Sequence, residues 1–203
     1  MDYIRKLFKK PEPENESKII TEVINFQLLY KNKKYTNTLL TDTIVKQLKS
    51  HFEQRYITAE CWVLTYSTIE HGCSLRTMLG CLKAHKHPYV IICQDMTENI
   101  FGVFFDNKIE ISLHTFGNAS TFLFKRNKKD EIIAYHSTLI NRYFCVCNPD
   151  YLAFGVGEGR YGLVFNKSML DGETCKVNTF NNELLTDNEY FKIKYLEVWS
   201  IKL

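Results

Sequence analysis

The sequence predicts an α+β fold in which an antiparallel β-sandwich is flanked by helices. The chain has 203 residues, of which 45% are hydrophobic and 14% aromatic, and this is enough to bury one sizeable core. Two amphipathic helical segments come first, and many short apolar runs separated by turn residues follow beyond Pro88. Because these runs do not alternate with helices, we expect an antiparallel sandwich with peripheral helices.

The first 37 residues differ in composition from the rest of the chain. Residues 1–17 combine a short basic amphipathic segment with the polar linker PEPENES, and residues 18–37 form an extension of undefined structure. A basic segment of this kind suits weak contact with an anionic membrane surface or an acidic partner. We therefore expect one folded domain over residues 38–203.

Two helices are predicted before the sheet region. The stretch TDTIVKQLKSHF reads as a helix capped at Thr41, with Lys46 and Lys49 on its polar face. Its apolar stripe comprises Ile44, Val45, Leu48 and Phe52. After a turn at His71 and Gly72, Ser74 is placed to cap a second helix. The buried face of that helix comprises Leu75, Met78, Leu79 and Leu82.

The predicted strands begin between these helices with CWVLTYS, in which apolar and small residues alternate. Further strands are predicted in YVIICQ, IFGVFF, STFLFKR, EIIAYH, YFCVC, YLAFGV, YGLVFN and FKIKYLEVWSI. Trp62 lies on the first strong strand and Trp199 on the last. We expect both indoles in the core and not at a ligand site.

Charge and cysteine usage narrow the class of protein. The 26 basic and 23 acidic side chains leave a net charge of +3, which gives no support to a nucleic-acid partner. Seven cysteines, none in a C-x-x-C pair, are scattered through apolar runs, as is usual for unpaired thiols in a reducing compartment. The sequence shows no secretory signal and no apolar run of membrane-spanning length, so we expect a soluble intracellular protein without a transmembrane segment.

The run from Gly157 to Val164 matches G-x-G-x-x-G-x-V, the pattern with which protein kinases cover ATP. A kinase also needs a lysine on a following strand and the H-R-D and D-F-G motifs, but only 39 residues follow Val164 and neither tripeptide occurs. A dinucleotide site would need a helix after the glycines, where the sequence predicts a strand. We interpret the run, with Gly155, Gly157, Gly159 and Gly162, as a tight strand connection.

Two other candidate sites have weaker support. Zinc could be ligated by Cys81, His85, His87 and Cys93, but their spacing matches no paired-knuckle pattern, and the polar stretch KAHKHP favours a solvated loop. Cys73 precedes a helix, where a thiolate is stabilised, yet a thiol nucleophile also needs a base and an oxyanion site. We therefore predict no catalytic residues, metal or cofactor, and interpret Cys73 as a packed cysteine.

The stretch CWVLTYSTIEHGCSLRTML resembles the opening signature of the TLDc domain of oxidation-resistance proteins. The matching positions are Trp62, Leu64, Tyr66, Ser67, His71, Gly72, Ser74, Leu75 and Thr77. Further segments resemble the family in the same order: IFGVFF, FGNASTFLFKR, YLAFGVGEGRYGLVFN, TFNNELLTDNEYF and IKYLEVWSI. The chain departs from the family pattern at Val156 and Glu158 in the glycine run, and at Ala119 or Ser120.

The resemblance implies a two-sheet antiparallel sandwich flanked by helices. It also implies protection against oxidative damage and association with the vacuolar-type proton-pumping ATPase, whose assembly some members regulate. No catalytic residue set is established for the family. The expected location is the cytoplasm, peripheral on vacuolar or other acidic-organelle membranes, with mitochondria as the alternative.

Two hypotheses follow. In the first, the chain is a noncatalytic regulator that binds the peripheral, cytosolic subunits of the proton pump. In the second, it is a thiol-dependent antioxidant enzyme that uses one of the seven cysteines. For the first, the expected partner-binding residues lie in two turns that we place at one end of the sandwich, and these residues are Ser67, Glu70, His71, Glu158 and Arg160.

Overall fold

Twelve strands and four helices follow one another through residues 27–31, 33–34 and 38–202, the part of the chain that the computed structural model describes. The basic segment 1–17 and most of the extension 18–37 lie outside the described residues. The elements are β1 (Gln27–Tyr30), β2 (Lys33–Lys34), α1 (Asp42–Lys49), α2 (Gln54–Ile57), β3 (Cys61–Ser67), α3 (Thr68–His71), α4 (Leu75–Leu82), β4 (Tyr89–Asp95), β5 (Ile100–Phe105), β6 (Phe122–Arg126), β7 (Ile132–His136), β8 (Cys145–Cys147), β9 (Tyr151–Gly157), β10 (Arg160–Asn166), β11 (Asp171–Glu173) and β12 (Tyr190–Lys202).

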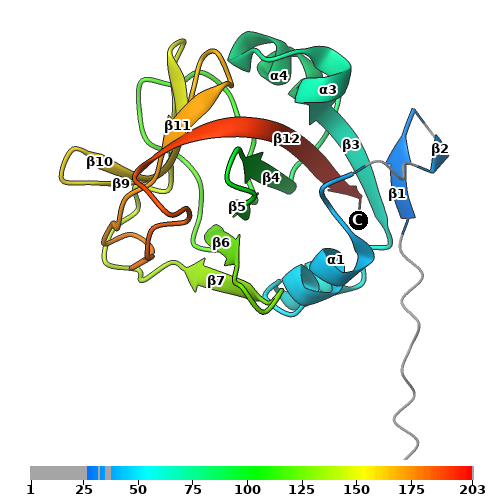
Figure 1. The fold of residues 1–203 in the computed structure, drawn as a ribbon, viewed down its shortest axis with the longest axis horizontal. Helices are drawn as coiled ribbons and strands as arrows, with labels where there is room; N and C mark the ends of the chain where they lie inside the picture. Colours follow the sequence, from blue (N-terminus) through cyan, green and yellow to red (C-terminus); the bar gives the residue numbers. More distant parts are fainter. Residues whose placement is uncertain (1–26, 32, 35–37, 203) are drawn as a thin grey trace, which may run out of the picture.

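The strands form two sheets that share β12. The large sheet has the order β2-β1-β3-β12-β4-β5-β6-β7, and the small sheet has the order β12-β11-β10-β9-β8. All neighbouring strands pair antiparallel except β1 and β3, which are parallel. The predicted antiparallel sandwich with peripheral helices is therefore confirmed (Figure 1).

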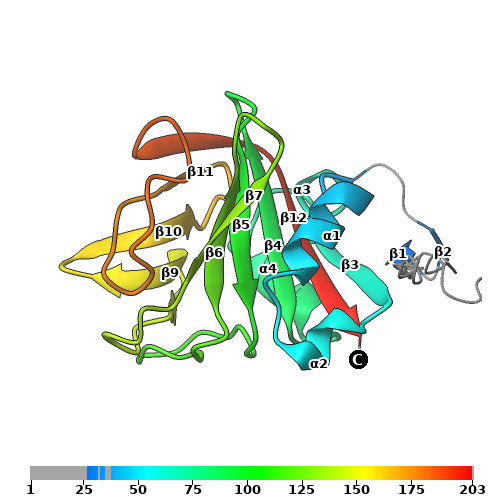
Figure 2. The same ribbon diagram turned by 90° about the horizontal axis from the view of Figure 1, so that it is seen from below.

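The large sheet is buried on both faces. One core cluster packs its β4 and β5 side chains against the small sheet and α4. A second cluster packs the opposite face against α1 and the residues that follow it, including Phe52 and Tyr56. Figure 2 shows the resulting layers, with the small sheet at the left, β4 to β7 in the middle, and α1 and α2 at the right. Burial on both faces explains why β4 and β5 read as nearly continuous apolar runs.

The predicted helices and long strands are present, with local corrections. Thr41 and Ser74 cap α1 and α4 as expected, because each hydroxyl accepts a hydrogen bond from a backbone amide three residues later. Lys49 was expected on the polar face of α1, but it is buried, and its Nζ donates to the Ala59 carbonyl at 2.7 Å. Burial lowers the pKa of this lysine.

The sequence reasoning missed only short elements. Helix α2 and helix α3 have four residues each, too few for a periodic apolar pattern. Strand β11 is the tripeptide DGE, which carries no apolar signal and is placed by pairing with β10 on one side and β12 on the other.

A buried carboxylate lies in the middle of β12. Glu197 is 2% exposed and accepts hydrogen bonds from Thr38 Oγ1 at 2.8 Å, the Leu39 amide at 3.0 Å and Trp199 Nε1 at 2.9 Å. Burial raises the pKa of Glu197, while these donors favour the charged form and oppose the shift. The carboxylate thereby attaches residues 38–40 to the shared strand.

Both tryptophans are fully buried, so Trp62→Ala and Trp199→Ala should each lower the free energy of unfolding by about 3–5 kcal/mol. Urea unfolding followed by circular dichroism measures the change. An unchanged midpoint for either variant would show that the indole does not pack as described.

The corresponding phenylalanine variants separate packing from hydrogen bonding. Trp199 Nε1 donates to Glu197, whereas Trp62 Nε1 has no hydrogen-bond partner among the described residues. We therefore expect Trp199→Phe to be more destabilising than Trp62→Phe, because only the first leaves a buried carboxylate short of a donor. The opposite order in the same urea experiment contradicts this account.

Glu197 should also make stability depend on pH. Because its pKa is raised in the folded state above the ordinary value of 4.5, the folded chain binds more protons than the unfolded chain just above that pH. This contribution to stability is present at low pH and is lost as the pH rises through the folded-state pKa. The Glu197→Gln variant should show a smaller loss of stability with rising pH. Its stability should be lower at every pH, because one of the hydrogen-bond donors around residue 197 then faces an amide NH₂ group. Urea midpoints measured at pH values from 4.5 upward test the prediction, and the exposed Glu110→Gln substitution is the control. Equal slopes of midpoint against pH for Glu197→Gln and the parent chain would contradict it.

Candidate functional site

The turn between β3 and α4 is organised by the side chain of Tyr66. Its hydroxyl donates to the Gly72 carbonyl at 2.6 Å and accepts from the Ser74 amide at 3.2 Å. Gly72 has a φ of 77° and ends α3, a conformation that favours glycine. Burial raises the pKa of Tyr66 to about 12, so its hydroxyl stays protonated and remains a donor. Hydrogen bonds of the Tyr66 hydroxyl therefore hold the turn between Tyr66 and Ser74.

The three partner-binding candidates in this turn differ in what they offer to a partner. Ser67 is 1% exposed, and its Oγ caps α3 by accepting from the Ile69 amide at 3.2 Å. His71 stacks on the Tyr66 ring, and its Nδ1 accepts from the Ser67 amide at 3.1 Å. Only Glu70 is exposed. Ser67 and His71 thus shape the turn, and Glu70 is the member that faces solvent.

The glycine run forms the hairpin between β9 and β10. Gly157 pairs with Arg160, and the two residues between them both have positive φ, 53° for Glu158 and 75° for Gly159, which is typical of a two-residue type I′ turn. Gly155 also has a positive φ, and a Cβ there would lie 2.8 Å from the Phe180 ring. The structure therefore bears out the interpretation of the run as a tight strand connection.

The charged residues of this hairpin are exposed, and Arg160 Nη1 lies 3.5 Å from the Glu189 carboxylate. Beside the hairpin runs the loop 138–143, in which the Tyr143 carbonyl accepts from the Val156 amide at 2.9 Å. The Thr179 hydroxyl contacts both the loop, at Asn141 Oδ1, and strand β9, at the Val156 carbonyl.

Three large apolar side chains of the loop are exposed, and these are Leu139 (72%), Ile140 (73%) and Tyr143 (52%). Leu139 also has a φ of 62°, which is unfavourable for a residue of its size. Thr138 ties the loop to residues 178 and 179, and these hydrogen bonds hold the strained conformation. We call Leu139, Ile140, Tyr143, Glu158 and Arg160 the hairpin face.

The two predicted groups do not form one surface. The β9–β10 hairpin lies at the left in both views, and α3 lies far to its right (Figures 1 and 2). The reason is that Ser67, Glu70 and His71 follow β3 of the large sheet, whereas Glu158 and Arg160 belong to the tip of the small sheet. The expectation that both turns lie at one end of the sandwich is wrong.

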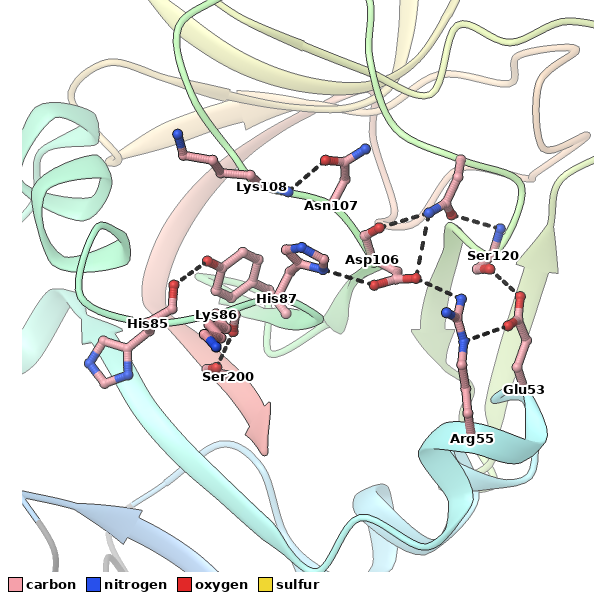
Figure 3. A network of polar contacts seen from close by, with 12 residues as sticks. Glu53, Arg55, His85, Lys86, His87, Asp106, Asn107, Lys108, Ser120 and Ser200 are labelled. Atoms are coloured by element: carbon pink, nitrogen blue, oxygen red, sulfur yellow. Dashed lines mark hydrogen bonds and ion pairs between the residues drawn. The ribbon is translucent and has the colours of Figure 1, made fainter. Parts of the chain in front are cut away.

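A polar network surrounds the buried carboxylate of Asp106, directly after β5. Its oxygens contact Arg55 Nη2 at 2.9 Å and His87 Nδ1 at 3.0 Å, while its backbone carbonyl accepts from Asn118 Nδ2 at 2.7 Å (Figure 3). Arg55 also pairs with Glu53, which contacts the Ser120 hydroxyl. Asp106 thereby connects α2, the loop before β4 and the loop before β6.

A cavity of about 890 Å³ lies beside this network. Its walls are helix α4, the following residues 83–89 and the segment 108–111, with Pro149 at one side. Residues 83–88 form a loop as the sequence predicts, and Lys83, Ala84, Lys86 and His87 are exposed, while His85 is partly buried and His87 contacts Asp106. Burial, together with the charge of Lys202, lowers the pKa of His85 and favours its neutral form.

The thiols of the chain are unpaired, and most lie in apolar surroundings. Burial raises the pKa of five of the seven, which are Cys81, Cys93, Cys145, Cys147 and Cys175. A raised pKa disfavours the thiolate that nucleophilic or redox chemistry requires. Cys73 was interpreted as packed, but it is exposed.

Within the described part of the chain, no cluster of three or more His, Cys, Asp or Glu side chains is arranged to hold a metal. None of the four helices there is both long and apolar enough to span a bilayer.

Asp106 and Glu197 are the residues that the sequence reasoning missed. The available signal was a single carboxylate in an apolar strand. Asp106 stands at the end of IFGVFFD, and Glu197 stands inside YLEVWSI. A charge in such a position is costly unless it has partners, so it indicates a buried network. The exposed apolar residues of the hairpin face gave no comparable signal, because an apolar residue in a sequence is usually assigned to the core.

Comparison with known proteins identifies related chains. Residues 33–202 match the family model described as the TLDc domain. The chain is 30% identical to Nuclear receptor coactivator 7 of Gallus gallus and 31% identical to Oxidation resistance protein 1 of Bos taurus, in each case over more than four fifths of its own length. It spans less than a fifth of these two relatives, which is 18% and 19% of their lengths. It is also 27% identical to Oxidation resistance protein 1 of Yarrowia lipolytica, covering 94% of the chain and 86% of that protein.

The Asp106 network predicts a measurable stability effect. Asp106→Ala should lower the free energy of unfolding by about 1.5–3 kcal/mol, because it removes hydrogen bonds made to a charged acceptor. Urea unfolding measures the loss. The matched control is Glu110→Ala, whose exposed pair with Lys108 should contribute less than about 1 kcal/mol. Equal effects of the two substitutions would show that Asp106 does not hold the segments together.

Proposed function

This chain belongs to the TLDc domain family, and from that membership we propose that it is a noncatalytic regulator of the vacuolar-type proton-pumping ATPase. In this proposal it binds peripheral, cytosolic subunits of the pump and influences their assembly. We further propose that it contributes to protection against oxidative stress, following the name of its relatives, and that it acts in the cytoplasm at the surface of acidic organelles.

The family match over residues 33–202 is the observation that carries this proposal. Burial raises the pKa of the Cys93 and Cys145 thiols, which disfavours a nucleophilic role for these two cysteines in the alternative of a thiol-dependent enzyme. A regulator can shift the pump between assembled and dissociated states only by binding one state more tightly than the other. A docking surface of defined shape is therefore what the role requires.

We propose that the hairpin face provides this docking surface. Exposed apolar side chains flanked by charges are characteristic of protein interfaces. The type I′ turn and the bonds of Thr138 and Thr179 fix the backbone under this surface before any partner arrives. Fixed geometry lowers the entropy cost of association. In this proposal Glu158 and Arg160 orient a partner more than they add affinity.

The hairpin face can be tested by charge reversal. Glu158→Lys combined with Arg160→Glu should weaken co-purification of pump subunits about tenfold, equivalent to ~1.4 kcal/mol. Adding Ile140→Ser should weaken it further. The unfolding free energy of the charge-reversal variant should stay within about 0.5–1 kcal/mol, because the lost Arg160–Glu189 pair is exposed. Pull-down from native membranes, quantified by mass spectrometry, measures the association.

A matched control lies at the other end of the same hairpin. Asp150 and Lys167 form an exposed pair at 2.8 Å, beyond the opposite ends of β9 and β10. Reversing both charges there should leave pump association unchanged. Undiminished co-purification of the hairpin variant would exclude the hairpin face, and failure of the parent chain to retain any pump subunit would contradict the proposed function itself.

A further inference from the structure

The cavity beside α4 has an apolar floor, and no side chain in the described part of the chain fills the cavity. Its volume is about 890 Å³, within the range typical of sites that bind small molecules or inserted side chains. Leu75, Leu82, Tyr89 and Ile109 line it, and each is almost completely buried. An occupant with an apolar group would therefore be shielded from water on several sides.

The rim of this cavity is basic. Arg76, Lys83 and Lys86 line it and are exposed, and no carboxylate in the described part of the chain forms an ion pair with any of them. Lys108 also lies on the rim, where it is paired with Glu110. The apolar floor is complementary to an apolar side chain of a ligand. The basic residues on the rim are complementary to carboxylates that lie next to that side chain.

The cavity wall formed by residues 85–87 is fixed in place by hydrogen bonds. Tyr89 Oη donates to the His85 carbonyl at 2.9 Å, Ser200 Oγ donates to the Lys86 carbonyl, and His87 Nδ1 contacts Asp106 (Figure 3). Three successive residues of the wall are thus attached to β4, β12 and the end of β5. The cavity is preformed, which lowers the cost of binding.

A glycine, Gly80, lies on the side of α4 that faces the cavity. It lies inside α4 and lines the cavity, yet a Cβ at this position would meet nothing within 4 Å. Packing within the chain therefore does not require a glycine here, although glycine is unfavourable inside a helix. Close approach of another backbone is a recognised use of such a residue.

The apolar surface continues outside the cavity mouth. Ile111 lines the cavity and is 57% exposed, and Leu113, two residues further along the chain, is 98% exposed. A small ligand confined to the cavity would leave both side chains in water. A longer occupant that extends over the rim would cover them.

We propose that this cavity binds an acidic peptide segment of a partner protein, which inserts an apolar side chain between α4 and residues 108–111. Carboxylates of the segment pair with Arg76, Lys83 and Lys86, and its backbone passes over Gly80. The inference deepens the proposed docking function and depends on it only for the identity of the partner. The site is distinct from the hairpin face, because α4 and the β9–β10 hairpin belong to different parts of the fold (Figure 1).

The probe is a phage-displayed library of random twelve-residue peptides, selected against the full chain. Enriched sequences should combine several Asp or Glu residues with at least one large apolar residue. Synthetic, fluorescein-labelled copies of these peptides then give dissociation constants by anisotropy. Binding should weaken as the salt concentration rises, because the rim cations are exposed.

Two variants locate the site. Lys83→Glu with Lys86→Glu should raise the dissociation constant at least about tenfold, whereas Lys128→Glu with Lys129→Glu, the same charge change in the β6–β7 turn, should leave it unchanged. Gly80→Leu places a side chain in the cavity and should also abolish binding. Its thermal stability should not fall, because leucine favours a helix more than glycine does, so lost binding cannot be attributed to unfolding.

Three outcomes overturn the proposal. In the first, the library yields no consensus that combines acidic and apolar residues. In the second, enriched peptides bind the Gly80→Leu variant as tightly as they bind the parent chain. In the third, oleate binds with the same dependence on Lys83, Lys86 and Gly80 while no peptide does, which would make the cavity a site for a small anionic amphiphile. None of these experiments contains the proton pump, so their failure leaves the proposed regulatory function standing.

Discussion

Strand β12 joins the two halves of the molecule, and the rest of the structure depends on its pairing. Its first residues pair with β11 in the small sheet, Ile193 to Ser200 pair with β4, and Glu197 to Lys202 pair with β3 on the other side. Register shifts at Ile193/Tyr195 and at Val198/Trp199 allow one strand to follow the curvature of both sheets. Because the sheets share a backbone, their relative orientation is set by ladder hydrogen bonds as well as by side-chain packing.

This sharing explains why a charge is retained in the middle of the core. Glu197 lies where β12 is covered on both sides by strands, and its oxygens accept from residues 38 and 39 as well as from Trp199. An apolar residue could fill the same volume, but it would leave these buried donors without partners, which is unfavourable. The carboxylate therefore determines where the chain before α1 attaches, and so how α1 covers the large sheet.

How far the sequence predicts the structure depends on the length of each element. Strand β5 was predicted to the residue because burial on both faces leaves an uninterrupted apolar run, and β3 was predicted to the residue from its alternating pattern. Helices α1 and α4 were predicted from their caps and apolar stripes. Four-residue helices and the tripeptide β11 are placed by tertiary pairing, which a local pattern does not contain. The candidate site was less predictable, because Asp106 depends on partners in three other segments and the cavity depends on how α4 meets residues 108–111.

The residues that resemble the family most closely support the fold and do not form the exposed surface. Tyr66, His71 and Ser74 hold the turn before α4, Gly159 allows the hairpin to close, and Gly155 leaves room for the Phe180 ring. The exposed apolar side chains of the hairpin face and of Ile111 and Leu113, in contrast, lie in loops outside the matching segments. Since α4 forms one wall of the basic cavity, a substitution in the His71–Gly72 turn would tilt that wall without touching a ligand. If such a variant loses partner binding, the first explanation is a displaced α4. A direct role of the turn residues in binding would require evidence that the helix stays in place.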